Sequence, residues 1–155
     1  MVRYAKKLFL FSIIIVSQIA NANPSRLITN YSDLLSSVSQ GKTIRAIMFT
    51  KKCSPAATED AIAGINFTTF NKYQVPVGSE KKDTIATSIM MTVLHDQLGP
   101  VNDYVRLRVF ADNSVEIFND FLDPTTYKSL GSKTMNCAIS NGHDQNGVLL
   151  YDISE

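Results

Sequence analysis

Apolar and polar residues recur along this chain with two different periods, and the first is helical. Four apolar residues stand at the i, i+3, i+4 and i+7 positions of one helical face: Tyr31, Leu34, Leu35 and Val38. A polar residue among positions 29–32 can cap the start of the helix, and Gly41 suits the position just beyond its end. The pattern therefore predicts one short amphipathic helix over residues 31–38.

From residue 43 onward the pattern is mainly that of strands. The expected strands cover residues 43–50, 65–70 with Tyr73, 84–94, 104–110, 115–121, 133–139 and 148–153. Residues 54–63 are interpreted as a helical turn or a loop excursion that ends at Gly64. A second helical turn is expected over 123–127, with Asp123 as its cap and Pro124 at its first position.

The clearest strand signal is a hairpin. Valines and a leucine alternate with Arg106 and Arg108 over residues 105–109, and the turn residues 111–114 lead into the next run, 115–118. The alternation places the apolar side chains on one face and the arginines on the other. One helix followed by consecutive antiparallel strands predicts an α+β fold, in which the N-terminal helix packs on a curved, predominantly antiparallel sheet or a small barrel.

The first 22 residues have the pattern of a secretory signal peptide. They combine three basic residues, an apolar run over 8–16 and a small-residue site at Ala20 and Ala22, so cleavage is expected before Asn23. The apolar stretch over 8–20 is shorter than the roughly 20 residues that a membrane-spanning helix needs. The sequence therefore predicts export to the periplasm or beyond, contact with the membrane only during export, and one mature domain over residues 23–155.

Removal of this segment changes the charge of the chain. The whole sequence has 15 basic and 14 acidic residues; three of the basic ones lie in the first 22 residues, so 12 remain against 14 acidic residues and the formal charge becomes −2. A slightly acidic domain without a basic stripe lacks the footprint that phosphate binding needs. We therefore expect no nucleic-acid partner.

The two cysteines, Cys53 and Cys137, are predicted to form a disulfide, because exported chains occupy compartments in which such bonds persist. A reactive Cys53 is the alternative. It precedes Ser54 and Pro55, a plausible helix start at which a thiolate would be stabilised. The position three residues on, where thioredoxin-like enzymes carry a second cysteine, is Ala56. A metal site of both cysteines and both histidines is disfavoured, because the short paired spacings of structural zinc modules are missing.

Few other residues suggest catalysis. His95 and His143 each precede an aspartate, but adjacent side chains usually point apart and no local motif pairs either histidine with a nucleophile. Four carboxylates were considered as an acid pair: Asp112, Glu116, Asp120 and Asp123. Turn capping already explains two of them. We expect no catalytic residues, no metal site and no cofactor, and we expect the strand aromatics to be core residues unless a closed sheet makes them line a cavity.

Several segments of the chain together form a recognisable pattern: Tyr31–Leu35, Gly41–Ala46, Cys53, Gly64, Tyr104–Val109 and Val115–Ile117. In these segments the chain resembles the VirK family of exported, virulence-associated bacterial proteins. The resemblance implies an exported factor linked to host association and no known catalytic residue. We therefore expect a factor that acts by binding a protein or a small ligand, with a thiol-dependent redox or chaperone-like protein using Cys53 as the alternative.

Overall fold

The structure, a computed structural model, describes residues 25–57 and 61–153. The expected signal peptide and its cleavage site at Ala20, Ala22 and Asn23 lie outside the described residues. The elements are β1 (Arg26–Ile28), α1 (Tyr31–Ser39), β2 (Ile44–Phe49), a 3-10 turn η1 (Thr50–Lys52), β3 (Ile62–Asn66), β4 (Asn71–Val77), β5 (Glu80–His95), β6 (Gly99–Phe110), β7 (Ser114–Leu122), β8 (Ser129–Ala138) and β9 (Val148–Asp152). No helix in this part of the chain is long and apolar enough to cross a bilayer.

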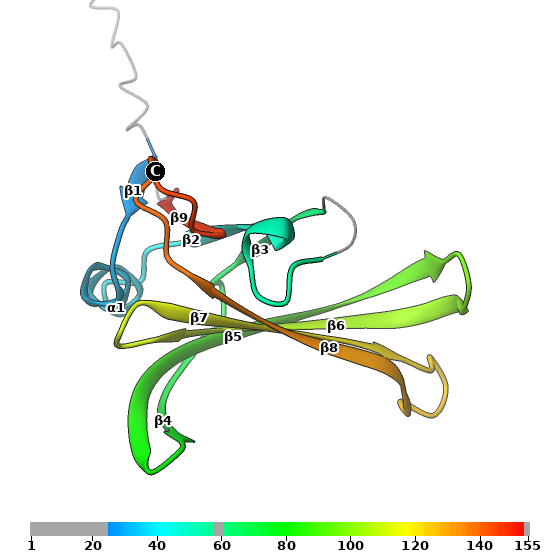
Figure 1. The fold of residues 1–155 in the computed structure, drawn as a ribbon. Helices are drawn as coiled ribbons and strands as arrows, with labels where there is room; N and C mark the ends of the chain where they lie inside the picture. The colour runs from blue at the N-terminus through cyan, green and yellow to red at the C-terminus, as the bar shows by residue number, and fades with distance from the viewer. Residues whose placement is uncertain (1–24, 58–60, 154–155) are drawn as a thin grey trace, which may run out of the picture.

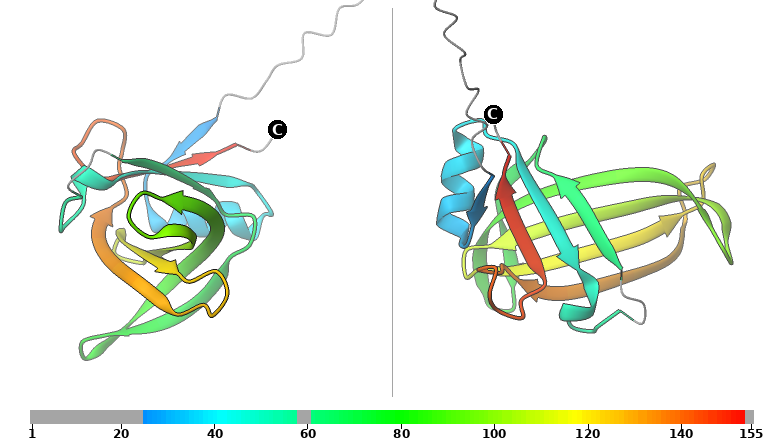
Figure 2. Two further views of the ribbon diagram at one scale, coloured as in Figure 1. Left: turned by 90° about the vertical axis from the view of Figure 1, so that its right-hand side faces the viewer. Right: turned by 90° about the horizontal axis from the view of Figure 1, so that it is seen from above.

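The strands form two antiparallel sheets. The small sheet has the order β1-β9-β2-β3 and the large sheet the order β4-β5-β6-β7-β8. The two sheets lie as layers, and the hairpin ends of the large sheet project beyond the small one (Figures 1 and 2). Within the described ranges, two isolated bridges, Ser54 with Asn136 and Ile139 with Val148, are the only strand-like pairings outside these sheets.

The expectation of a helix packed on one sheet, or of a small barrel, was wrong. The described chain is mostly β, in two sheets that do not close into a barrel, with α1 as its one α-helix. The physical reason is that β1 and β9 come from opposite ends of the chain and complete a sheet around β2. This second sheet supplies most of the apolar cover that the helix was expected to give.

The core lies between the two sheets. In β2, Ile44, Ala46 and Met48 are buried and alternate with Arg45 and two half-buried residues, as expected for a strand with one face inside. The large sheet contributes a matching set of buried side chains: Ile85, Leu107, Val109, Val115, Ile117 and Met135. All of them belong to one contiguous apolar cluster, so the two layers share a core.

The helix prediction was confirmed. Asn30 caps α1, because its side-chain oxygen accepts a hydrogen bond from the Asp33 amide at 2.9 Å. Tyr31, Leu34 and Val38 are buried in the shared core. The Tyr31 amide also donates to Oδ1 of Asn113 at 2.7 Å, which ties the start of the helix to the turn between β6 and β7.

The hairpin prediction was also confirmed. Val109 pairs with Val115 and Arg108 with Glu116, across a turn in which Asn113 has a left-handed φ of 66°. Of the two interpretations of residues 54–63, the described residues 54–57 and 61 agree with the loop excursion and not with the helical turn; η1 comes earlier, at Thr50–Lys52, and β3 begins at Ile62. The expected turn at Asp123 is present as the β7–β8 connection.

Candidate functional site

Cys53 and Cys137 are joined by a disulfide, with their Cα atoms 4.6 Å apart. Cys53 follows η1 in the connection between β2 and β3, whereas Cys137 lies in β8, so the bond links the small sheet to the large one. Beside it, the Ser54 amide donates to the Asn136 carbonyl and the Asn136 amide donates to the Ser54 carbonyl, each at 2.7 Å. The bond thus closes a preformed backbone contact between the layers.

The surroundings of Cys53 do not resemble the expected helix start. Residues 54–57 contain no helix, and Cys53 caps the end of η1, where its amide donates to the Thr50 carbonyl at 3.3 Å. The dipole at a helix N-terminus is therefore absent from this position. Both cysteines of the sequence are held in the disulfide, so neither is a free thiol in this structure.

The two histidines lie in separate places, and among the described residues neither forms a side-chain hydrogen bond with its neighbouring aspartate. Nδ1 of His95 accepts from the Gln97 and Leu98 amides at 3.2 and 3.3 Å, and its ring meets the Phe121 ring edge-on at 4.8 Å. The carboxylate of Asp144 is instead held by Ser140, Asn141 and Asn146, next to an exposed His143. Within residues 25–57 and 61–153, no three potential metal ligands gather in one group.

His95 does have an acidic neighbour, from the paired strand rather than from the adjacent position. Asp103 of β6 lies within electrostatic reach of His95 and accepts a hydrogen bond from the Asn119 side chain. Burial raises the pKa of Asp103, and the bond from Asn119 and the charge of His95 oppose this only in part. His95, Asp103 and Asn119 come from the paired strands β5, β6 and β7, so their spacing in the sequence did not indicate that they lie close together.

The four carboxylates considered as an acid pair do not converge on one cleft. Asp123 accepts from the Thr125 and Thr126 amides at one end of β7, and Asp112 caps the turn at the other end. The nine residues of β7, at about 3.3 Å each, separate them by roughly 30 Å. Asp120 accepts from the Ser129 hydroxyl at 2.6 Å. Glu116 is the carboxylate that belongs to a larger cluster.

The side chain of Asp112 is well supported despite its exposure. The hydrogen bond from Lys82 and then that from the Ser114 hydroxyl lower the pKa of Asp112 to about 2. The Ser114 amide donates to the same carboxylate at 3.1 Å. Asp112 is thus a turn residue that also ties β5 to the β6–β7 turn through Lys82.

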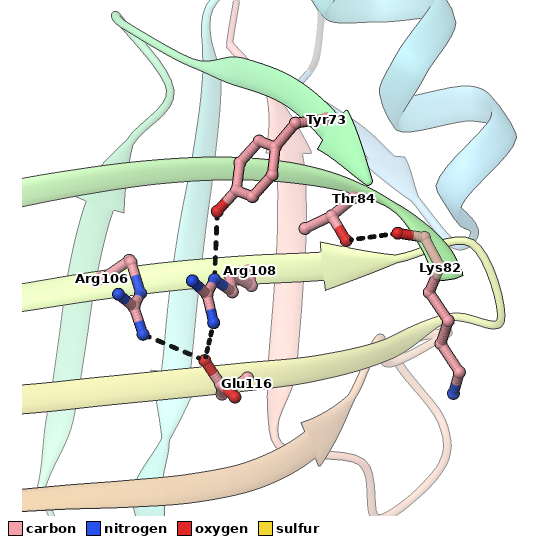
Figure 3. Close-up of polar contacts among 6 residues, drawn as sticks. All are labelled: Tyr73, Lys82, Thr84, Arg106, Arg108 and Glu116. Carbon is pink, nitrogen blue, oxygen red and sulfur yellow. Dashed lines mark hydrogen bonds and ion pairs between the residues drawn. The ribbon is translucent and has the colours of Figure 1, made fainter. Parts of the chain in front are cut away.

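Glu116 is the centre of a cluster on the outer face of the large sheet. Its Oε1 accepts from Arg108 Nη1 at 3.0 Å and from Arg106 Nη2 at 3.3 Å (Figure 3). Arg108 Nε also donates to the hydroxyl of Tyr73, in β4, at 3.1 Å. The hydroxyl of Thr84 donates to the Lys82 carbonyl beside this group. Three strands, β4, β6 and β7, therefore hold two guanidiniums in fixed positions.

Aromatic rings surround these guanidiniums. Arg106 lies over the Phe118 ring at 4.9 Å, and that ring meets Tyr104 edge-on at 6.3 Å. A hollow of about 210 Å³ opens beside them, lined by Thr69, Phe70, Asn71, Tyr73, Ala86, Thr87, Ser88, Tyr104 and Arg106. We call this hollow, with Arg108 and Glu116, the outer cradle.

The electrostatics of the outer cradle favour a fixed positive charge. Burial lowers the pKa of Arg108, but the hydrogen bond to Tyr73 and the charge of Glu116 outweigh it, so the net shift is upward. Two guanidiniums share one carboxylate, which leaves an excess positive charge. Nε of Arg106 is buried and has no hydrogen-bond partner among the described residues, so this guanidinium is less fully satisfied than that of Arg108.

A second cleft, of about 550 Å³, lies between the two sheets at their open side. It is lined by Arg45, Ile47, Ile62, Ala63, Gly64, Ile65, Asn66, Thr68, Ser88 and Ile89. Its walls are therefore β3, with the adjoining outer face of β2, and the middle of β5. We call it the edge cleft.

Sequence reasoning missed both hollows. The alternation in the hairpin did place Arg106 and Arg108 on the face away from the core, and the turn length would have set Glu116 opposite Arg108. Tyr73 joins them only because β4 pairs with the start of β5. The aromatic residues of the strands were expected in the core, yet Phe70 and Tyr73 are 38% and 37% exposed.

Comparison with known proteins identifies the family. The model of the VirK protein family matches residues 27–127. The structure is also similar to the crystal structure of lpg1832, a VirK family protein from Legionella pneumophila, with a TM-score of 0.60 and 20% sequence identity, covering 80% of this chain and 97% of that one. No curated protein matches. The match spans α1 and most of both sheets, including the outer cradle, and the chain belongs to the VirK family.

Proposed function

We propose that this VirK family protein is an exported, virulence-associated factor that acts by binding, and that its ligand is a polar molecule carrying a carboxylate. The observation that carries the proposal is the outer cradle, in which two guanidiniums fixed by Glu116 and Tyr73 stand beside a hollow with aromatic walls. Guanidiniums bind carboxylates through parallel, charge-assisted hydrogen bonds.

The proposed ligand follows from the chemistry of the lining. Arg106 uses one nitrogen for Glu116 and keeps donor capacity toward the hollow, so it supplies the anion contact. Phe70 and Tyr104 offer flat apolar surface, and Asn71 and Ser88 offer amide and hydroxyl groups. A carboxylate on a small polar body suits this set better than a purely apolar molecule.

Export is part of the same proposal. It is supported by the pattern of the first 22 residues and by the disulfide, because such bonds persist on the oxidising side of the cytoplasmic membrane. We accordingly take residues 23–155 as the mature chain and as one domain.

A titration of the oxidised mature protein tests the binding step. Amide signals are followed by NMR while two matched pairs of probes are added: glucuronate with glucose, and the tripeptides Gly-Glu-Gly with Gly-Gln-Gly. We expect the acidic member of a pair to shift signals at Phe70, Tyr73 and Tyr104 at least tenfold more strongly than its neutral partner. Equal shifts for charged and neutral probes, or shifts centred elsewhere, would contradict the proposal.

Two variants complete this test. Arg106→Gln removes the anion contact and should abolish the shifts. Lys133→Gln removes the same charge from an exposed residue of β8 on the opposite face of the large sheet, and should leave them intact. Equal loss in both variants would indicate attraction by overall charge rather than by the outer cradle.

A further inference from the structure

The strand β3 ends the small sheet, and one of its edges has no partner strand among the described residues. Hydrogen bonds from the Thr50 amide to the Ala61 carbonyl and from the Phe67 amide to the Ile44 carbonyl show which residues of β3 face β2. Because bonded and non-bonded pairs alternate in antiparallel ladders, the amides and carbonyls of Ile62, Gly64 and Asn66 point away from β2.

The strand β5 has a similar free edge. Its partner β4 covers only residues 80–86, so the described chain provides no second partner from Thr87 onward. The bond from the Ala111 amide to the Asp83 carbonyl sets the phase of pairing with β6, and the backbone groups of Ser88 and Met90 consequently point away from β6. The edge cleft lies between this edge and that of β3.

Neither edge carries the usual protection against pairing. Folded proteins shield edge strands with charged residues, prolines or bulges. The sequence of β3 is Ile62–Asn66 without any charge or proline, and residues 87–94 of β5 are likewise uncharged. Ile62 is 66% exposed and Met90 50%. Both edges therefore present backbone amides and carbonyls that are unpaired within the described chain, without charged residues or prolines that would prevent another strand from pairing.

We propose that the edge cleft binds an extended segment of a partner protein as an added β-strand paired with β3. The occupant is a free segment rather than the edge of a second folded copy, because the cleft, lined by β2, β3 and β5, holds about 550 Å³, which suits a few extended residues and not a sheet. Main-chain hydrogen bonds to Gly64 and its neighbours supply affinity, as in other cases of strand addition.

The side chains around the cleft define the sequence of this segment. Gly64 leaves a gap on the outer face next to Ile47, so a large apolar residue of the partner fits opposite Gly64. The adjacent residues of the partner face Ile89 and are apolar. At the far end, Arg45 donates to Asn66 at 3.1 Å and has no carboxylate partner among the described residues, so an acidic residue two positions from the large one completes the segment.

A display experiment with the oxidised mature protein tests this inference. A library of random twelve-residue peptides on phage is selected against the immobilised protein, and the enriched peptides are synthesised for affinity measurements. We expect alternating apolar residues with a large one two positions from an acid. Hydrogen exchange should then show that peptide binding slows the Gly64 and Ser88 amides at least tenfold, whereas Ala63 and Ile65 are protected throughout.

Two variants at one position separate backbone pairing from other effects. Gly64→Pro removes the outward amide without touching a bond to β2, and Ala63 before it is already extended. Gly64→Ala keeps the amide, and its new methyl group would meet only the Ala46 carbonyl at 3.7 Å. Peptide affinity should fall at least tenfold in the proline variant and less than threefold in the alanine variant, with unchanged circular dichroism.

The remaining outcomes contradict the inference. Absence of enriched peptides, equal affinity in both Gly64 variants, or exchange protection elsewhere would each overturn it. Protection of Gly64 without peptide, together with a dimeric mass in solution, would assign the edge to a second copy and overturn it as well. The inference is tested separately from the outer cradle at the Gly64 amide, because Gly64 lines the edge cleft alone, whereas Ser88 lines both hollows.

Discussion

Removal of the disulfide should weaken the attachment between the two sheets. The bond closes a loop with a sequence separation of 84 residues. In the chain-entropy model such a loop corresponds to about 4 to 5 kcal/mol of stabilisation. The backbone contact of Ser54 with Asn136 and the bridge between Ile139 and Val148 do not involve the sulfur atoms, so we expect them to persist on reduction and to retain part of the linkage. We therefore expect a measured loss of about 2 to 4 kcal/mol.

The variants Cys53→Ser and Cys137→Ser should lose similar amounts, because either one opens the same loop. Urea unfolding, followed by circular dichroism with and without reductant, measures the free energy of unfolding. Reduced wild-type protein should match the double variant. A loss below about 1 kcal/mol would refute the structural role of the bond. A stability loss confined to one of the two single variants would instead favour a separate role for that thiol.

Further predictions concern packing and charge. Gly147→Ala should cost about 1 to 3 kcal/mol, because its new methyl would lie 2.8 Å from a disulfide sulfur, whereas Gly131→Ala meets nothing within 4 Å and should be neutral; thermal unfolding compares them. Leu150→Ala should cost about 3 kcal/mol from a fully buried site, and Leu130→Ala, 45% exposed, much less. The pKa of Asp112 lies below its value in the unfolded chain, so its contribution is complete above about pH 4 and is lost as the pH falls towards 2. Unfolding at several pH values should show a steeper decline over that interval in wild type than in Asp112→Asn.

Local features of the fold were predictable from the sequence. The helix at Tyr31–Ser39 and the β6–β7 hairpin depend on caps, turn residues and periodicity within about a dozen residues. The division into two sheets depends instead on pairing between β1 and β9, which are separated by almost the whole described chain. The three residues of β1 are too few to show a strand pattern, so the sequence does not predict that β1 pairs with β9.

The candidate sites likewise combine residues whose proximity was predictable from local sequence with residues whose proximity was not. Arg106, Arg108 and Glu116 lie in one hairpin, so their proximity follows from the register of a single turn. Tyr73 enters the outer cradle from β4, and the edge cleft exists only because β3 and β5, from different sheets, approach each other. The position of Tyr73 and the existence of the edge cleft both depend on contacts between strands that are distant in the sequence. No local sequence pattern predicts such contacts.

We propose that this VirK family member is exported and that the bond between Cys53 and Cys137 closes the exported chain. Intact mass of the protein recovered from outside the cytoplasm, with and without reduction and alkylation, tests this most directly. We predict a chain that begins at Asn23 and takes up alkyl groups at both cysteines only after reduction. A mass that retains residues 1–22 would contradict export by a cleaved signal peptide, and alkylation of both cysteines in native material would contradict the disulfide.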